Sequence, residues 1–138
     1  MLQAMNTGHE GSLTTVHANS PRDAISRLET MVLMCNANMS PLVIGRQIAS
    51  ALNVVVHIRR YSDGVRRVES ISELTGLEGK VITMQEIISF VQTGVSSEGK
   101  CLGHYKLHAV KPKFLERAKA FGLFSLSNGT PTHTALAK

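Results

Sequence analysis

Histidine, hydroxyl and glycine residues gather within ten positions near the start of the chain. The segment reads GHEGSLTTVH and covers residues 8–17. Glycines let a backbone approach an anion closely, and Ser and Thr hydroxyls donate hydrogen bonds to it. An imidazole can donate to a terminal phosphate or orient an attacking water. These residue types together suit a phosphate group, although spacing alone equally allows His9 to cap a turn and His17 to end a strand.

A second group of residues has spacing that a metal ion could use. Cys101, His104 and His108 lie within eight positions of one another. On a strand, however, His104 and His108 point to one face and Cys101 points to the other. No fourth ligand is close in sequence, and a closed metal site requires one. We therefore expect no metal site.

Two arginine pairs, Arg59-Arg60 and Arg66-Arg67, flank a short turn. Clustered guanidinium groups could bind the phosphates of a nucleic acid, face solvent, or contact a neighbouring subunit. Tyr61 is the only aromatic residue nearby in sequence, so the stacking surface typical of single-strand binding is missing. Nucleic acid is not an expected partner.

The elements that must position these residues follow from capping signals and hydrophobic spacing. Ser20-Pro21 and Ser40-Pro41 mark two helix starts, and the β-branched run from Val54 marks a strand. Thr83 and Glu86 form a capping box, which predicts a third helix. The expected elements are the end of a helix at 1–8, a strand at 12–17, helices at 21–35 and 41–52, a β-hairpin at 54–74, a helix of about ten residues from 83, a strand at 102–109 and a helix at 112–121.

Length and composition indicate a folded protein with a single core, and the mixture of expected helices and strands places it in the α/β class. It has 138 residues, of which 43% are hydrophobic and 18% are charged, with a formal net charge of +5. No apolar run is long enough to span a membrane, and we expect no signal peptide. The two cysteines are far apart, which fits reduced thiols with packing roles in a reducing compartment. We expect a domain over residues 1–124 and a flexible polar tail over 125–138.

Several stretches together resemble one protein family. GHEGSLTTVHANSPRDAISRLE is similar to the histidine box and following helix of the traffic ATPases of type II and type IV secretion and pilus assembly. QIASALNVVVHIRR, SDGVRRVESISELTG and LEGKVITMQEII follow in that family's order and spacing. The resemblance covers about residues 1–122. The eight-position separation of His9 and His17 resembles the branch of CpaF, from tight-adherence pilus assembly, and the conjugation ATPases.

The resemblance implies the C-terminal portion of a RecA-like P-loop NTPase domain. It implies that His9 and His17 of the histidine box (residues 8–19) act on the γ-phosphate as catalytic residues. The cofactor-binding residues implied on the γ-phosphate side are Gly8, Gly11, Ser12 and Thr15. The parent protein would use ATP and Mg²⁺, form a hexameric ring, contact pilus or secretion platform proteins, and lie in the cytoplasm at the inner membrane.

One departure from the family decides what this chain can do alone. It contains no G-x-x-x-x-G-K-[ST] loop to hold phosphates and Mg²⁺, and the family's acidic Walker B residue would precede Met1. Charge neutralisation and positioning supply nearly all catalysis in phosphoryl transfer. The isolated chain is therefore expected to be inactive. The alternative is a non-catalytic module that binds a partner protein or nucleic acid through its basic hairpin.

Overall fold

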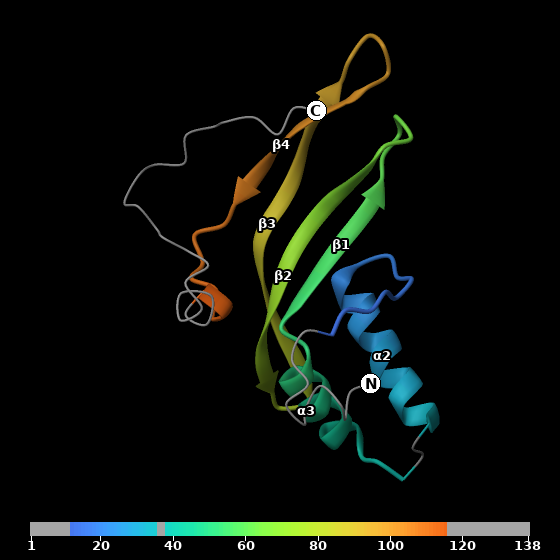
Figure 1. The fold of residues 1–138 in the computed structure, drawn as a ribbon, viewed down its shortest axis with the longest axis vertical. Helices are drawn as coiled ribbons and strands as arrows, with labels where there is room; N and C mark the ends of the chain where they lie inside the picture. Colours follow the sequence, from blue (N-terminus) through green and yellow to red (C-terminus); the bar gives the residue numbers. More distant parts are fainter. Residues whose placement is uncertain (1–11, 36–37, 116–138) are drawn as a thin grey trace.

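The computed structural model describes residues 12–35 and 38–115 (Figure 1). Two helices precede a four-stranded antiparallel sheet with the strand order β1-β2-β3-β4. The elements are α2 (Pro21–Cys35), α3 (Pro41–Ala51), β1 (Val54–Arg60), β2 (Arg66–Glu78), β3 (Val81–Val95) and β4 (Cys101–Leu107). The α/β class is thus confirmed for the described residues, whose sheet contains only antiparallel pairs.

Both helices begin where their capping signals predict. The hydroxyl of Ser20 accepts from the Asp23 N–H at 3.1 Å, and that of Ser40 accepts from the Val43 N–H at 3.4 Å. Each serine satisfies an N–H group that has no partner inside the helix. The following prolines occupy the first helical turn, where an N–H is not needed. The predicted helix pair is therefore confirmed.

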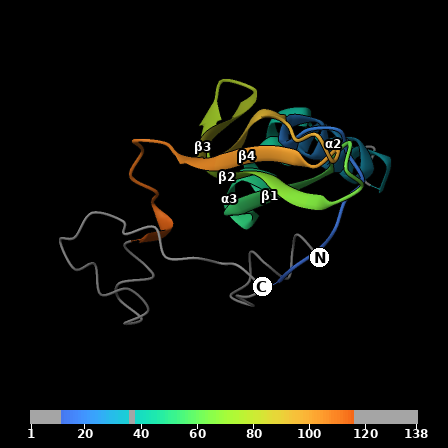
Figure 2. The same cartoon turned by 90° about the horizontal axis from the view of Figure 1, so that it is seen from above.

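The hydrophobic core lies between the two helices and one end of the sheet. It consists of Ile25, Ile44, Ile48, Leu74 and Ile82. Ile48 is fully buried, and Ile44 is 2% exposed. Burying one such side chain contributes about 1.5–3 kcal/mol. The helices cover only this end, and the other end of the sheet extends past them (Figures 1 and 2).

The predicted β-hairpin is confirmed as β1 and β2, which pair from Val54↔Glu73 to Arg60↔Arg66. Gly64 closes the turn with a φ of 78°, a conformation that favours glycine. Its N–H donates to the Tyr61 carbonyl at 2.9 Å. The predicted strand near the C-terminus is also confirmed, as β4.

The predicted helix from Thr83 is wrong, because this segment is strand β3, which also continues through Gly94. Side chains of this segment bond across the sheet instead. Thr75 Oγ1 donates to Thr83 Oγ1 at 2.8 Å, and Gln85 Nε2 donates to Glu73 Oε2 at 2.8 Å. Pairing with strands on both sides outweighs the local helix signal.

The predicted strand over residues 12–17 is also wrong, because this part of the chain is irregular. Within the described residues, no strand pairs with it. A run rich in Thr and Val becomes a strand only where a neighbour offers backbone partners.

The remaining predictions fall largely outside the described ranges. These are the helix end at 1–8, the tail at 125–138 and most of the helix at 112–121, of which residues 114–115 are described and helical. No helix in the described part of the chain is long and apolar enough to cross a membrane.

Candidate functional site

Three of the six predicted site residues lie in the described part of the chain. Ser12, Thr15 and His17 are all exposed in the irregular segment that leads to α2. Gly8, His9 and Gly11 lie outside the described residues. The structure therefore places one imidazole and two hydroxyls at the surface and does not test the roles assigned to them.

The start of α2 is not an open phosphate site. Its Asp23 N–H already bonds to the Ser20 hydroxyl. The Asp23 carboxylate adds negative charge to the first turn, where it stabilises the helix. An anion approaching this end would meet an occupied N–H group and a like charge. Any phosphate contact must therefore come from the segment before the helix.

These residues fit a contact to a phosphate but not the binding of a whole nucleotide. Exposed Ser12, Thr15 and His17 can donate hydrogen bonds. The sequence supplies no Walker A lysine or loop to hold the β- and γ-phosphates. Within residues 12–35 and 38–115, no group of three or more His, Cys, Asp or Glu residues could hold a metal ion.

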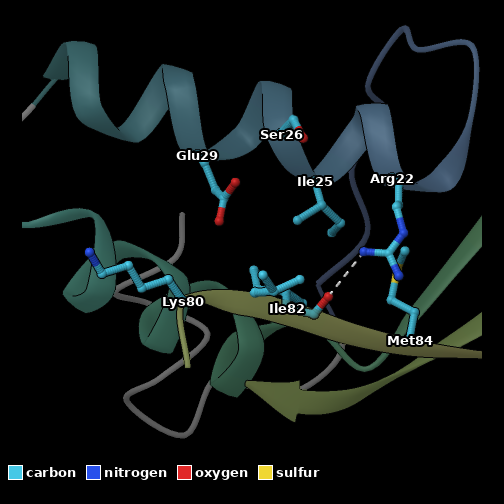
Figure 3. Close-up of a pocket in the computed structure, with 8 residues that line it drawn as sticks. Arg22, Ile25, Ser26, Glu29, Lys80, Ile82 and Met84 are labelled. Carbon is cyan, nitrogen blue, oxygen red and sulfur yellow. Dashed lines mark hydrogen bonds between the residues drawn. The ribbon is translucent and has the colours of Figure 1, made fainter. Parts of the chain in front are cut away.

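A small cavity lies between α2 and the start of β3 (Figure 3). Its volume is about 160 Å³, and Arg22, Ser26, Glu29 and Lys80 supply its polar groups. Arg22 Nη1 donates to the Ile82 carbonyl at 3.5 Å. The cavity is small beside the ~300–1,000 Å³ of ordinary ligand sites. His17 does not line it, and the sequence offered no signal that Lys80 would approach α2.

The suspected metal ligands take different roles. Cys101 is buried, whereas His104 is exposed on the same strand. His108 lies just beyond β4, where its Nε2 is 2.8 Å from Ser89 Oγ and 3.0 Å from Glu86 Oε1. His108 thus helps to join β3 to the chain after β4.

The free thiol Cys35 does not have the packing role predicted for it, and two methionines of α2 are exposed beside it. Cys35 is exposed, as are Met31 at 42% and Met34 at 81%. Met39 does pack against the core. Residues at the far end of α2 extend beyond the sheet, so helical spacing alone overestimated their burial (Figure 1).

Three of the four hairpin arginines bond within the molecule. Arg59 pairs with Glu69 at 2.8 Å, and Arg60 Nε donates to the Gly64 carbonyl at 3.0 Å. Arg67 donates both guanidinium nitrogens to Asp63, at 2.9 and 2.7 Å. These partners neutralise or occupy much of the positive surface that a polyanion would need.

Aromatic residues from a distant hairpin join this arginine cluster. The Phe90 ring lies 5.2 Å from Tyr61 and 5.3 Å from Tyr105, both edge to face. Arg67 lies over the Tyr61 and Phe90 rings, 5.5 and 5.8 Å from their centroids. Sequence reasoning missed these rings because only strand pairing brings β3 and β4 beside the first turn.

Asp63 links the two hairpins electrostatically. Hydrogen bonds from Arg67 hold the pKa of its carboxyl well below the ordinary value, despite partial burial. The backbone N–H groups of Cys101 and Val65 reinforce this effect. Burial raises the pKa of Tyr61, and the nearby Glu69 charge adds to the shift. We call Tyr61, Asp63, Arg67, Phe90 and Tyr105 the hairpin clasp.

Comparison with known proteins identifies the family. The sequence profile of the type II/IV secretion system protein family matches residues 1–100. A putative conjugal transfer protein of Mycobacterium tuberculosis is 37% identical over 81 residues, which are 59% of this chain and 22% of that protein. The conjugal transfer protein TrbB of Rhizobium radiobacter is 36% identical over 76 residues, 55% of this chain and 22% of its own length.

The chain thus spans about a fifth of the length of these curated relatives. The matched region contains residues 8–17, both helices, β1, β2 and β3. Because the profile covers well over half of the chain, this protein belongs to the type II/IV secretion system protein family, whose members are generally secretion ATPases.

Proposed function

We propose that this chain is the γ-phosphate side of a secretion ATPase with a RecA-like core. Such an ATPase couples ATP hydrolysis to protein export, pilus assembly or conjugal transfer. The observation that carries the proposal is the family match across residues 1–100, which includes the segment with His9 and His17. Their separation of eight positions supports the branch that holds CpaF-like and conjugal transfer ATPases.

The chemical role of this segment follows from its residue types. His17 can donate a hydrogen bond to the terminal phosphate or orient the attacking water. Ser12 and Thr15 can donate to the same phosphate oxygens. When bound, Mg²⁺ would neutralise charge on the transferring phosphate. Among the described residues, no group of three or more His, Cys, Asp or Glu residues could hold it.

The assembly we propose is a hexameric ring at the cytoplasmic face of the inner membrane, beside the platform proteins of a secretion system. Residues 8–19 would meet the phosphate of a nucleotide held by another part of the ATPase. The exposed position of Ser12, Thr15 and His17 supports this role, because such a contact needs an accessible surface.

The test compares this 138-residue chain with a polypeptide that also carries the phosphate-binding part of the ATPase domain. We expect magnesium-dependent ATP hydrolysis from the longer polypeptide and none from the 138-residue chain, since this chain lacks the Walker A loop. Steady phosphate release by the purified 138-residue chain would contradict the proposal.

A further inference from the structure

Strand β1 forms one edge of the sheet, and its C-terminal end extends past both helices (Figure 1). The Asn53 carbonyl accepts from the Leu74 N–H at 2.9 Å, and the Tyr61 N–H donates to the Val65 carbonyl at 3.0 Å. Both residues therefore direct backbone groups toward the other strand of the hairpin. Successive residues of a paired strand direct these groups to alternate sides. The residues whose N–H and C=O groups point to the free side are Val54, Val56, Ile58 and Arg60.

The same four residues have exposed side chains. Val54, Val56 and Ile58 are 37%, 51% and 57% exposed, whereas Val55 between them packs against the helical core. Alternate residues of a strand project to one face, so the three apolar side chains form a row that ends at Arg60. Within the described residues, no strand pairs with this side of β1. We call Val54, Val56, Ile58 and Arg60 the open edge.

The other edge strand, β4, is less suited to pairing. It contains Gly103 and Lys106. A lysine on an edge strand discourages pairing with another chain, and a glycine weakens a strand. From Val54 to Ile58, by contrast, β1 consists of β-branched residues and His57, which favour strand pairing. Of the two edges, the open edge is therefore the one suited to receive a further strand.

The open edge ends at an uncompensated pair of arginines. Arg60 lies directly opposite Arg66, and like charges opposite one another on paired strands are destabilising. Arg60 Nε donates to the Gly64 carbonyl at 3.0 Å, which leaves its charge unneutralised. Among residues 12–35 and 38–115, neither Arg60 nor Arg66 forms an ion pair. An anionic group between the two guanidinium groups would remove this repulsion.

The other two arginines of the hairpin each bind a carboxylate within the molecule. The pairs are Arg59 with Glu69 and Arg67 with Asp63. A carboxylate beside Arg60 and Arg66 would give these two residues the kind of partner that their neighbours already have.

The carboxylate closest to the open edge in the strand register is not available for this role. Glu73 pairs with Val54, at the opposite end of the open edge from Arg60, and is 2% exposed. Its two oxygens accept from the N–H groups of Lys113 and Phe114, each at 2.9 Å, so it caps these groups. Strand β1 of a second copy would not supply a carboxylate either, because VVVHIRR contains no acidic residue.

We propose that the open edge binds an extended segment of a partner protein, which adds a strand beside β1. The segment has alternating apolar side chains that lie along the apolar row, and an acidic residue beside Arg60 and Arg66. Backbone hydrogen bonds to the outward groups of β1 supply affinity, and the side chains supply selectivity. This contact uses no residue of the proposed phosphate segment at 12–17, so the two proposals can fail separately.

Short peptides test the proposed chemistry of the partner. Two fluorescein-labelled peptides alternate Thr and Val, and one carries Glu residues at its C-terminal end while the other carries them at its N-terminal end, so that both strand directions are covered. Fluorescence anisotropy with the 138-residue chain gives each Kd. We expect one peptide to bind about tenfold more tightly than its counterpart with Lys in place of Glu. Binding of neither peptide, or equal binding of the Glu and Lys forms, would overturn the proposal.

Charge reversal tests the arginine pair. Arg60→Glu combined with Arg66→Glu should invert the preference, so that the Lys peptide binds more tightly than the Glu peptide. Arg27→Glu combined with Arg46→Glu is the matched control, because it makes the same change in net charge at exposed positions of the helices. The control should keep the preference for Glu. Inversion in both variants would indicate a general charge effect and would overturn the proposal.

Substitutions at the centre of the open edge test the strand contact itself. Val56→Pro removes an outward N–H, a change that edge strands tolerate, and should weaken peptide binding about tenfold. Val56→Thr keeps the N–H and the β-branched shape and should weaken binding by less than about threefold. Val56→Lys keeps the backbone intact but should block pairing as edge lysines do. Far-UV circular dichroism must show that each variant is folded, and unchanged binding by the Val56→Lys variant would overturn the proposal.

A second copy of the chain at the open edge would give a different result. Size-exclusion chromatography with light scattering measures the mass of the 138-residue chain and of its Val56→Lys variant. We expect the same mass for both. A dimer of the wild type that Val56→Lys dissociates would show that a second copy occupies the open edge, and would overturn the proposal.

Discussion

The two ends of the sheet are stabilised by different kinds of contact. The helix-covered end buries Ile44, Ile48 and Leu74 in an apolar core. The free end depends on the hairpin clasp, in which Asp63 binds Arg67 and the Cys101 N–H. Apolar burial responds little to pH, whereas a clasp built on a carboxylate fails when that carboxylate is protonated. The free end should therefore respond to acid through Asp63, whereas the apolar side chains of the core should not.

The largest loss of stability should follow from a cavity in the apolar core of the helix-covered end. Ile48→Ala removes a side chain with no solvent exposure and leaves a cavity, so the free energy of unfolding should fall by about 2–5 kcal/mol. Urea denaturation followed by circular dichroism measures this change. Val43→Ala on the same helix is the control, since Val43 is 41% exposed. Equal losses from the two substitutions would show that the core does not stabilise this end.

A smaller loss of stability should follow from adding a side chain beside Phe90 at the free end of the sheet. Gly103 faces the Phe90 ring, and an added Cβ would also lie 2.6 Å from the Val91 carbonyl oxygen. Gly103→Ala should therefore displace Phe90 and lower the free energy of unfolding by about 1–3 kcal/mol. Gly94→Ala is the control, because nothing lies near its added Cβ. The same denaturation experiment applies, and a neutral Gly103→Ala would mean that the clasp is loosely packed.

Acid should weaken the free end specifically through Asp63. Its pKa is lower in the folded state, so its stabilisation is complete above the ordinary value of about 3.9 and is lost as pH falls below that value. Asp63→Asn should be less stable at pH 7 and should lose less stability between pH 5 and pH 2. Glu98→Gln, at an exposed ion pair, is the control. The midpoint of urea denaturation, measured at each pH, reports the stability of each variant. Equal losses of stability between pH 5 and pH 2 in the wild type and in Asp63→Asn would contradict the role given to Asp63 in the hairpin clasp.

The smallest effect should come from the hairpin charges on nucleic-acid binding. Arg59, Arg60 and Arg67 already have partners within the molecule. Reversing the charges of these residues and Arg66 should leave binding to a single-stranded oligonucleotide at the same negligible level. Fluorescence anisotropy at low and high salt measures this. Salt-sensitive binding that disappears on charge reversal would favour the alternative of a basic binding module.

Sequence signals were most reliable where the local chain alone determined the structure. Ser20-Pro21 and Ser40-Pro41 specify helix starts through bonds within a few residues, and Asp63-Gly64 specifies a turn. The helix prediction from Thr83 failed because the local capping signal competes with pairing to β2 and β4. That pairing cannot be read from the local sequence.

The candidate site was predictable only as a set of residue types. The resemblance of residues 8–29 pointed to the family, which the profile match supports independently. The clasp could not be predicted, because Phe90 reaches Tyr61 only through the register of three strand pairs. The capping of residues 113–114 by Glu73 depends on the same long-range register.

The most direct test of the proposed γ-phosphate role is His17→Ala in the complete ATPase. Asn19→Ala, at an exposed residue of the same segment, is the matched control. If His17 acts on the γ-phosphate during hydrolysis, its loss should lower kcat by about 10²–10⁴-fold and change the Kd for ATP far less. An unchanged kcat, or a loss confined to ATP binding, would contradict the account.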